Sequence, residues 1–230
     1  MVLDFSKTAA LLIPSLLQGF GVVIQATIFG FLLATILGMV IAIGRLSQIK
    51  VINGFLVFLL ELIRGTPLLV QLVYIYYVVP LLLNLAASVL GFKTDVQISS
   101  LTAGILGLGI NYGCYMSEVI RASILAVDYG QTEAALALGL EKYQALFRIV
   151  MPQALRSIIP SLGNYLVMMV KDTSLLAYVA VNELLLRTQT FASQTFLTIE
   201  SYTFLALAYM IISIPLSHLV KLIEKKCKTS

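Results

Sequence analysis

The sequence predicts an all-α integral membrane protein, and its composition and long apolar runs carry that prediction. Of the 230 residues, 60% are hydrophobic and 11% are charged, and the mean hydropathy is +0.99. A soluble domain of this size could not bury so much apolar surface. Several apolar runs reach the length of about 20 residues that spans a hydrocarbon core of about 30 Å. We therefore expect one transmembrane domain over residues 1–230, built from five transmembrane helices.

Polar residues and helix breakers mark the limits of the five predicted spans. Arg45 closes the first span, Gly65-Thr66-Pro67 interrupts the second, Arg121 closes the third and Pro152 precedes the fourth. The first run is far longer than the apolar region of a signal peptide, so we expect no cleaved leader. The spans are predicted at about residues 14–44, 51–83, 99–120, 155–170 and 202–222.

The distribution of basic residues predicts the orientation in the membrane. Five spans place the two termini on opposite sides. With the C-terminus in the cytoplasm, ten basic residues fall in inner segments and three in outer segments. Because Lys and Arg are retained on the cytoplasmic side, we expect the N-terminus outside and the loop of about residues 128–153 in the cytoplasm. The inner residues are Arg45, Lys50, Arg121, Lys142, Arg148, Arg156, Lys221, Lys225, Lys226 and Lys228, and the outer ones are Lys7, Lys93 and Arg187.

The cytoplasmic segment from Gln131 to Gln153 reads as two short helices joined at a glycine. The run EAALAL from Glu133 has high helix propensity, and Gly139 can adopt the positive φ that ends a helix. A second short helix is expected over residues 141–150, ending before Pro152, which suits the first turn of the next span. Physical chemistry alone leaves two interpretations open: an amphipathic helix lying on the bilayer surface, or a docking surface for a partner.

The spacing in this segment resembles the EAA loop of binding-protein-dependent ABC import permeases. Glu133, Ala134, Ala135, Gly139 and Pro152 match the family pattern. Three other segments, ELIRGTPLLVQL, IRASILAVDYG and VKDTSL, resemble the polar amino acid uptake permeases of the glutamine, histidine, cystine and arginine type. The resemblance covers essentially the whole chain. Two departures are Met151, where many members have Leu, and Tyr129, where Pro or Lys is common.

The resemblance implies a type I ABC importer permease fold in a bacterial inner membrane, crossed several times. It also implies a second permease subunit (an identical chain or a paralogue), a cytoplasmic ATPase dimer and an extracytoplasmic substrate-binding protein that delivers an amino acid. The chain lacks the G-x-x-x-x-G-K-[ST] phosphate loop, so we expect no enzymatic activity and no bound cofactor, with ATP-Mg on the partner ATPase. Membrane lipid is an expected partner and nucleic acid is not. The residues expected to dock the ATPase are Glu133, Ala134, Ala135, Gly139, Phe147 and Pro152.

Three polar positions from three spans are predicted to meet near the middle of the membrane. Arg64 lies roughly 20 Å along the second span at 1.5 Å per residue, and Lys171 lies at a similar depth in the fourth. Asn111 falls about halfway along the third. A cation is costly at the bilayer centre, so Arg64 should face a cavity or a partner. Because Glu61 lies one turn earlier, a structural ion pair and a role at the substrate both stay open.

A broken helix in the second span supports a substrate site at this depth. Gly65 loosens the helix and Pro67 removes a backbone hydrogen bond, and broken helices near the midplane recur at transporter substrate sites. For Lys171 and Asp172, a salt bridge that seats the end of the fourth helix is the alternative to ligand contact. The predicted substrate path comprises Arg64, Thr66, Pro67, Gln71, Asn111, Lys171, Asp172 and Ser174.

Other functions are weaker matches to the sequence. An intramembrane enzyme would need a nucleophile–base pair or metal ligands within the spans, and the single His218 has no Cys or carboxylate cluster near it in sequence. Cys114 and Cys227 are expected at different depths and predict no disulfide. A channel or ATP-independent carrier would leave the EAA-like loop without a purpose. Within the resemblance, a methionine-type importer is the nearest alternative.

Overall fold

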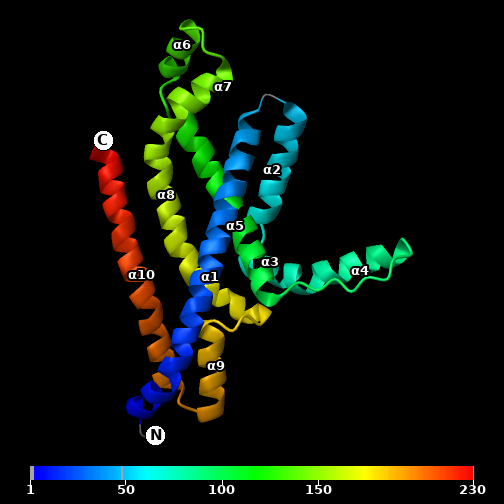
Figure 1. The fold of residues 1–230 in the computed structure, drawn as a ribbon, viewed down its shortest axis with the longest axis vertical. Coiled ribbons are helices and arrows are strands. Elements are labelled where there is room, and N and C mark those ends of the chain that lie inside the picture. The colour runs from blue at the N-terminus through cyan, green and yellow to red at the C-terminus, as the bar shows by residue number, and fades with distance from the viewer. Residues whose placement is uncertain (1–2, 48, 230) are drawn as a thin grey trace.

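The computed structural model describes residues 3–47 and 49–229, and no strand occurs in these ranges. The molecule is elongated, with the N-terminus at one end and α6 and α7 at the other (Figure 1). Following the predicted orientation, we call the end with α6 and α7 the inner end. The elements are α1 (Phe5–Leu46), α2 (Lys50–Arg64), α3 (Leu68–Val73), η1 (Tyr74–Val78), α4 (Val79–Val89), α5 (Ser100–Leu125), α6 (Tyr129–Ala137), α7 (Lys142–Ala145), η2 (Leu146–Val150), α8 (Met151–Asp172), η3 (Thr173–Val179), α9 (Leu184–Thr195) and α10 (Thr198–Thr229).

The centre of the bundle is the long contact between α1 and α5. Small residues let the two backbones approach closely, as is usual between membrane helices. A Cβ added to Gly38 would lie 3.1 Å from Cβ of Met116, and one added to Gly113 would lie 3.0 Å from Cβ of Leu37. Leu108 and Met116 are fully buried beside this seam. The seam therefore fixes α5, which carries much of the site described below.

The segment after α2 departs from the predicted single interrupted span over residues 51–83. The break at residues 65–67 occurs as expected, with Pro67 in an extended conformation at the start of α3. Beyond it, however, α3, η1 and α4 turn away from α2 and project sideways as an arm (Figure 1). In α4 only Pro80 is buried, while Leu81 and Val89 are 68% and 78% exposed. A helix that is apolar on all sides needs lipid or another protein around it.

The helices differ in how clearly they qualify as membrane spans. By length and composition, three described helical stretches could cross a membrane: Phe5–Leu46, Leu68–Val89 and Thr198–Cys227. The helices α5 and α8 do not qualify by the same measure of length and composition. Both carry polar side chains that face the interior. Intramembrane polar groups normally face the bundle rather than lipid. The prediction of five spans thus stays a prediction.

An additional helix, α9, lies at the outer end, where the sequence predicted only a connecting segment. The carboxylate of Glu183 accepts hydrogen bonds from the backbone N–H groups of Leu185 and Leu186, at 2.8 and 2.9 Å, and so caps the helix. The hydroxyl of Tyr209 donates a third bond of 2.8 Å. Burial of this carboxyl raises its pKa. These bonds hold α9 against α10.

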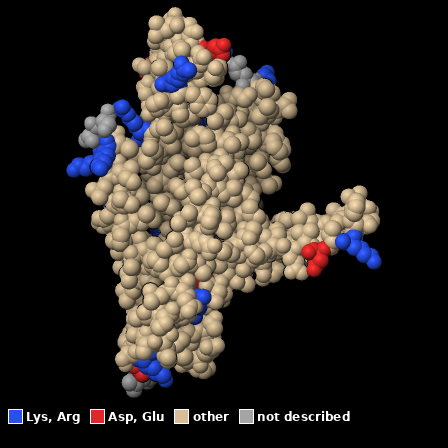
Figure 2. Space-filling model, viewed as in Figure 1, with Lys and Arg blue, Asp and Glu red and all other residues tan. Residues whose placement is uncertain are grey.

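At the inner end, an ionic cluster joins α1, α2 and α5. Glu118 lies 3.5 Å from Nε of Arg45 and 3.2 Å from Nη2 of Arg121. Arg45 also donates to the amide oxygen of Asn53 in α2. On the face drawn in Figure 2, charged side chains gather mainly toward the two ends and at the tip of the arm. This distribution fits a long apolar middle with polar ends.

Candidate functional site: a polar pocket and a protruding helical hairpin

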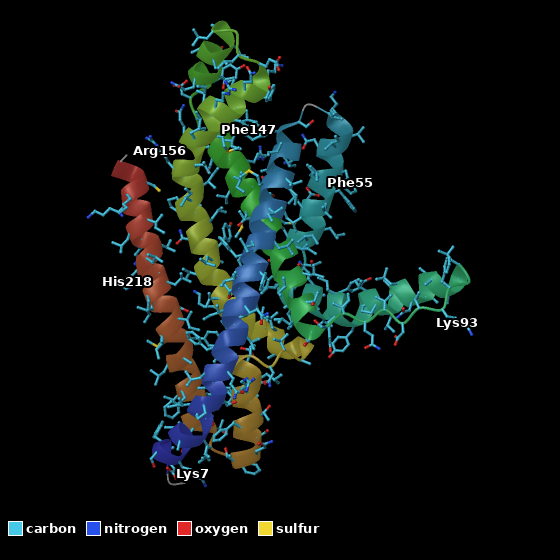
Figure 3. The ribbon with its side chains drawn as sticks, in the orientation of Figure 1. Lys7, Phe55, Lys93, Phe147, Arg156 and His218 are labelled. Carbon is cyan, nitrogen blue, oxygen red and sulfur yellow. The ribbon has the colours of Figure 1, made fainter. Side chains whose placement is uncertain are left out.

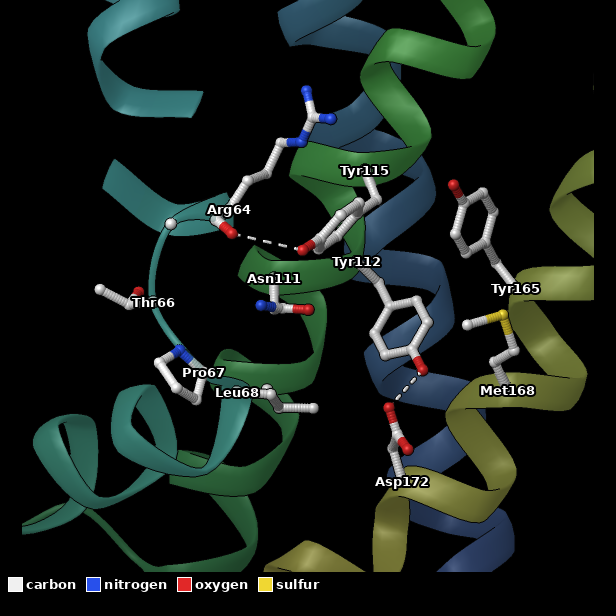
Figure 4. A pocket seen from close by; sticks show the side chains of 11 residues that line it. Arg64, Thr66, Pro67, Leu68, Asn111, Tyr112, Tyr115, Tyr165, Met168 and Asp172 are labelled. Atoms are coloured by element: carbon white, nitrogen blue, oxygen red, sulfur yellow. Dashed lines mark hydrogen bonds between the residues drawn. The ribbon is translucent and has the colours of Figure 1, made fainter. Parts of the chain in front are cut away.

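A cavity of about 470 Å³ opens between the helix break after α2, the middle of α5 and the last turns of α8 (Figure 4). Five of its lining residues belong to the predicted substrate path: Arg64, Thr66, Pro67, Asn111 and Asp172. Thr66 and Pro67 come from the helix break, which therefore forms one wall. The remaining lining residues are Gly65, Leu68, Tyr112, Tyr115, Tyr165 and Met168.

Arg64 lines this cavity, and none of the described carboxylates forms an ion pair with its guanidinium. Its Cζ lies 5.3 Å from the centre of the Tyr115 ring, a cation–π contact. The Tyr115 hydroxyl donates to the backbone oxygen of Arg64 at 3.5 Å (Figure 4). Among the described residues, no ion pair joins Arg64 to Glu61, so the structural ion pair that we considered is not formed. The exposed guanidinium is available to an anion in the cavity.

Gln71 hydrogen-bonds the helix break from behind the cavity wall, and Asn111 links Gln71 to the cavity. Nε2 of Gln71 donates to the backbone oxygens of Ile63 and Thr66, at 2.6 and 3.0 Å, and contacts Oγ1 of Thr66 at 2.9 Å. Its Oε1 accepts a 3.1 Å bond from Nδ2 of Asn111. The carbonyls freed by the break therefore find a partner inside the protein, as a membrane protein requires. Asn111 lines the cavity, whereas Gln71 lies behind it.

The opposite wall carries Asp172, the one carboxylate among the described residues that line the pocket. The Tyr112 hydroxyl donates a 2.6 Å hydrogen bond to Oδ2 of Asp172 (Figure 4). The Tyr112 ring packs edge-on against Tyr165, with ring centres 6.0 Å apart. Asp172 is thus held by a phenol from another helix, and not by a salt bridge with Lys171.

Besides Gln71, two further residues of the predicted path lie outside the pocket lining, Lys171 and Ser174. Lys171 is exposed, because one residue of helix rotation turns it away from the face that carries Asp172. The Ser174 hydroxyl donates to the backbone oxygen of Lys171 at 2.9 Å. The expected meeting of Arg64, Asn111 and Lys171 is therefore a meeting of Arg64, Asn111 and Asp172.

The sequence interpretation missed the aromatic walls of the pocket. On α8, Tyr165, Met168 and Asp172 recur at i, i+3 and i+7, and on α5 Tyr115 lies one turn after Asn111. These spacings place each set on one helical face. Following them outward from Asn111 and Asp172 would have found the missing side chains.

The protruding hairpin has the expected glycine turn. Gly139 adopts φ +83°, and its N–H bonds the oxygen of Leu136 at 2.9 Å, closing α6. This confirms the predicted positive φ. The second short helix does not end before Pro152, however. A π-helical turn, η2, continues it into α8 without a break. Pro152 has no backbone N–H to donate, and the changed hydrogen-bond pattern of the π-turn tolerates that loss.

The hairpin exposes an apolar surface at the tip of the molecule (Figure 3). Leu138 is 84% exposed and Phe147 is 51% exposed. Glu133 and Ala134 are also exposed, but Ala135 is buried within the hairpin. Ala135 therefore packs the hairpin internally rather than offering a small face to a partner. The other exposed apolar residues here are Tyr129, Leu136 and Tyr143.

The described part of the chain holds no group of three or more His, Cys, Asp or Glu residues placed to bind a metal ion. Instead, a long helical membrane domain encloses a pocket with one cation, one carboxylate and aromatic walls, and carries an exposed apolar hairpin at one end. These features are those of a membrane permease subunit.

Comparison with known proteins agrees with this class. The family model described as "binding-protein-dependent transport system inner membrane component" matches residues 34–229. The chain is 36% identical to a probable amino-acid ABC transporter permease of Sinorhizobium fredii, over 93% of this chain and 87% of that protein. It is 31% identical to the glutamine transport system permease GlnP of Escherichia coli, over 94% of each chain.

Solved structures show the same fold. The crystal structure of an amino acid ABC transporter with histidines superposes with a TM-score of 0.85 at 32% identity, covering 98% of this chain and 100% of that one. An inward-facing methionine ABC transporter gives a TM-score of 0.63 at 16% identity, covering 95% and 98%, and is similar in fold alone. The chain belongs to the family of binding-protein-dependent transport system inner membrane components.

Proposed function

We propose that the chain is the permease subunit of an ATP-driven, binding-protein-dependent ABC importer for a polar amino acid. The observation that carries the proposal is the pocket that joins Arg64 on one wall to Asp172 on the other. A zwitterionic amino acid carries both charges, and each wall offers the complement of one of them. Relatives named as amino-acid and glutamine permeases at 31–36% identity support the same substrate class.

The roles within the pocket follow from its contacts. The Arg64 guanidinium binds the substrate carboxylate, because no described carboxylate neutralises it. Asp172, held in place by Tyr112, binds the substrate ammonium group. Tyr115, Tyr165 and Met168 provide the apolar surface against which the rest of the amino acid packs. The neutral break at Thr66 and Pro67 forms the remaining wall.

Energy enters through a separate ATPase, which binds ATP-Mg. The exposed surface of Leu138 and Phe147, beside Glu133, docks that ATPase. Because η2 joins the hairpin to α8 without a break, a displacement of the hairpin moves the helix that carries Asp172. Closure of the ATPase dimer thereby changes access to the pocket from one side of the membrane to the other.

Two further partners complete the importer. A binding protein delivers the amino acid from outside, and a second permease subunit, identical or paralogous, completes the membrane domain. The arm formed by α3, η1 and α4 supports the presence of a second permease subunit, since α4 packs against little of its own chain. Exposed apolar surface of that extent marks lipid or protein contact.

The test is substrate-stimulated ATP hydrolysis by the complex reconstituted in nanodiscs with its ATPase and binding protein. The expected result is stimulation by one or a few polar amino acids from a panel that also contains methionine. Stimulation by methionine alone would replace the proposal by a methionine-type importer. Uptake into liposomes without ATP or ATPase would refute the ABC assignment in favour of a carrier or channel.

A further inference from the structure

A polar stripe runs along the inner part of α8 on the side that faces α10. It consists of four polar residues and one proline at helical spacing i, i+3, i+4, i+7 and i+8: Gln153, Arg156, Ser157, Pro160 and Ser161. Helix faces that meet inside a membrane are normally apolar or small. The next turn of α8 follows that rule, because a Cβ added to Gly163 would lie 2.8 Å from Val220 of α10. The stripe begins where this tight contact ends.

The stripe lines a cavity between the two helices. The cavity, here called the α8–α10 pocket, measures about 380 Å³ and is completed by Glu224 and Cys227 of α10. It shares no residue with the substrate pocket. Figure 3 places Arg156 near the inner end of α8, across from the last turns of α10 and below the hairpin. In the predicted orientation, that height is the cytoplasmic boundary of the bilayer.

The surroundings of the α8–α10 pocket are basic. Arg156 lines it, and Lys221, Lys225 and Lys226 lie on the turns of α10 that border it, against the single carboxylate of Glu224. Blue side chains gather at this corner of the molecule in Figure 2. Clusters of Lys and Arg just inside a membrane helix attract the anionic lipids of the cytoplasmic leaflet.

The same turns of α10 also expose apolar side chains. Leu219, Leu222 and Ile223 are 53%, 61% and 37% exposed. A soluble anion would gain nothing from such neighbours, whereas a phospholipid would place its acyl chains on them. Basic and apolar groups side by side at the edge of the bilayer thus distinguish a lipid from a free phosphate.

We propose that the α8–α10 pocket binds the phosphate of an anionic phospholipid, with Arg156 as its principal ligand. The planar guanidinium can donate two parallel hydrogen bonds to phosphate oxygens. The lysines of α10 add attraction without fixed geometry, each contributing about a fivefold gain in affinity. The lipid would join the inner ends of α8 and α10, so this site lies apart from both the substrate and the ATPase.

The chain contains its own reporter for this site. Cys227 lines the α8–α10 pocket, while Cys114 is 2% exposed and serves as an unreactive reference. The experiment measures alkylation of Cys227 by an uncharged maleimide in the full chain, reconstituted in nanodiscs with a graded fraction of phosphatidylglycerol in phosphatidylcholine. Phosphatidylglycerol is expected to slow the reaction. Lys225→Gln should need about fivefold more phosphatidylglycerol for half-maximal protection. Arg156→Gln should need about 10- to 100-fold more, because it also loses the hydrogen bonds to the phosphate.

Three controls make the result specific. Lys93→Gln removes a basic residue from the loop after the arm, far from the pocket, and should leave protection unchanged. If protection depended only on the total positive charge of the protein, Lys93→Gln would weaken it as much as Arg156→Gln does. Arg156→Lys should restore part of the protection, and thermal unfolding in the same nanodiscs checks folding. If Arg156→Gln does not fold, Lys225→Gln tests the same site through an exposed side chain.

Three outcomes would overturn the proposal. Equal alkylation rates at every lipid composition, or protection unaffected by both variants, would show that no anionic headgroup occupies the pocket. Protection by soluble glycerol phosphate in pure phosphatidylcholine nanodiscs, equal to that by the lipid, would assign the site to a free phosphate instead.

Discussion

Nδ2 of Asn111 donates a 3.1 Å hydrogen bond to Oε1 of Gln71, which ties the middle of α5 to the helix break after α2. Both residues were predicted to lie on the substrate path. The structure gives Gln71 a different task, since its Nε2 satisfies carbonyl groups that the break leaves open. The substrate pocket is therefore shaped by a buried polar network behind its wall.

Gln71→Leu is expected to destabilise the protein by about 1–3 kcal/mol, because it removes the side-chain donor to the backbone oxygen of Thr66 and the shortest of the hydrogen bonds to that of Ile63. Thermal unfolding of the purified permease measures this loss. Gln97→Leu, in an exposed segment, should have little effect. An unchanged unfolding temperature for Gln71→Leu would show that water satisfies the break.

Asn111→Leu is expected to weaken the apparent affinity for substrate while the ATPase stays bound. The side chain both lines the pocket and contacts Gln71, so its loss changes the wall without touching the hairpin. Substrate titration of ATP hydrolysis and co-purification of the ATPase measure the two properties separately. An unchanged affinity would remove Asn111 from the site.

Arg64→Ala is expected to reduce substrate affinity about 10- to 100-fold, the value of a hydrogen bond to a charged group, while expression and folding change little. The guanidinium contacts an aromatic ring and no described carboxylate, so its removal leaves no buried charge unpaired. Arg64→Lys keeps the positive charge but loses the planar guanidinium, so its substrate affinity should lie between that of the unchanged protein and that of Arg64→Ala. Loss of folded protein in parallel with transport would assign Arg64 a structural role instead.

Tyr112→Phe is expected to weaken substrate affinity about fivefold, by releasing Asp172 from its 2.6 Å hydrogen bond. Asp172→Asn should cause a larger loss, because it removes the charge that faces the substrate ammonium. Combining the two changes should cost no more than Asp172→Asn alone, since Tyr112 acts through that carboxylate. Additive losses would mean that Tyr112 contacts the substrate directly.

The sequence predicts most of this architecture where local chemistry decides it. Gly65 and Pro67 predict the helix break, and Gly139 predicts the turn of the hairpin, because both features depend on the backbone properties of single residues. The sideways course of α4 was not predicted, since the direction taken after a break is set by packing and not by the apolar pattern. Lys171 and Asp172 show the same limit for the site. Neighbours in sequence point about 100° apart on a helix, and only the position of α5 decides which of them meets the pocket.

Glu133→Lys is expected to leave the permease folded but to uncouple it from ATP hydrolysis, because Glu133 is exposed on the hairpin next to the apolar docking surface. A reversal of charge there opposes a partner that accommodates an acidic group. The measurement is substrate-stimulated ATP hydrolysis by the assembled complex, together with the amount of ATPase that co-purifies. Asp95→Lys, in the segment between the arm and α5, makes the same charge change far from the hairpin and should leave both values unchanged. Normal stimulation in Glu133→Lys would exclude this residue from docking. Gly139→Val should still disrupt docking in that case, because φ +83° strains a β-branched residue and distorts the turn of the hairpin.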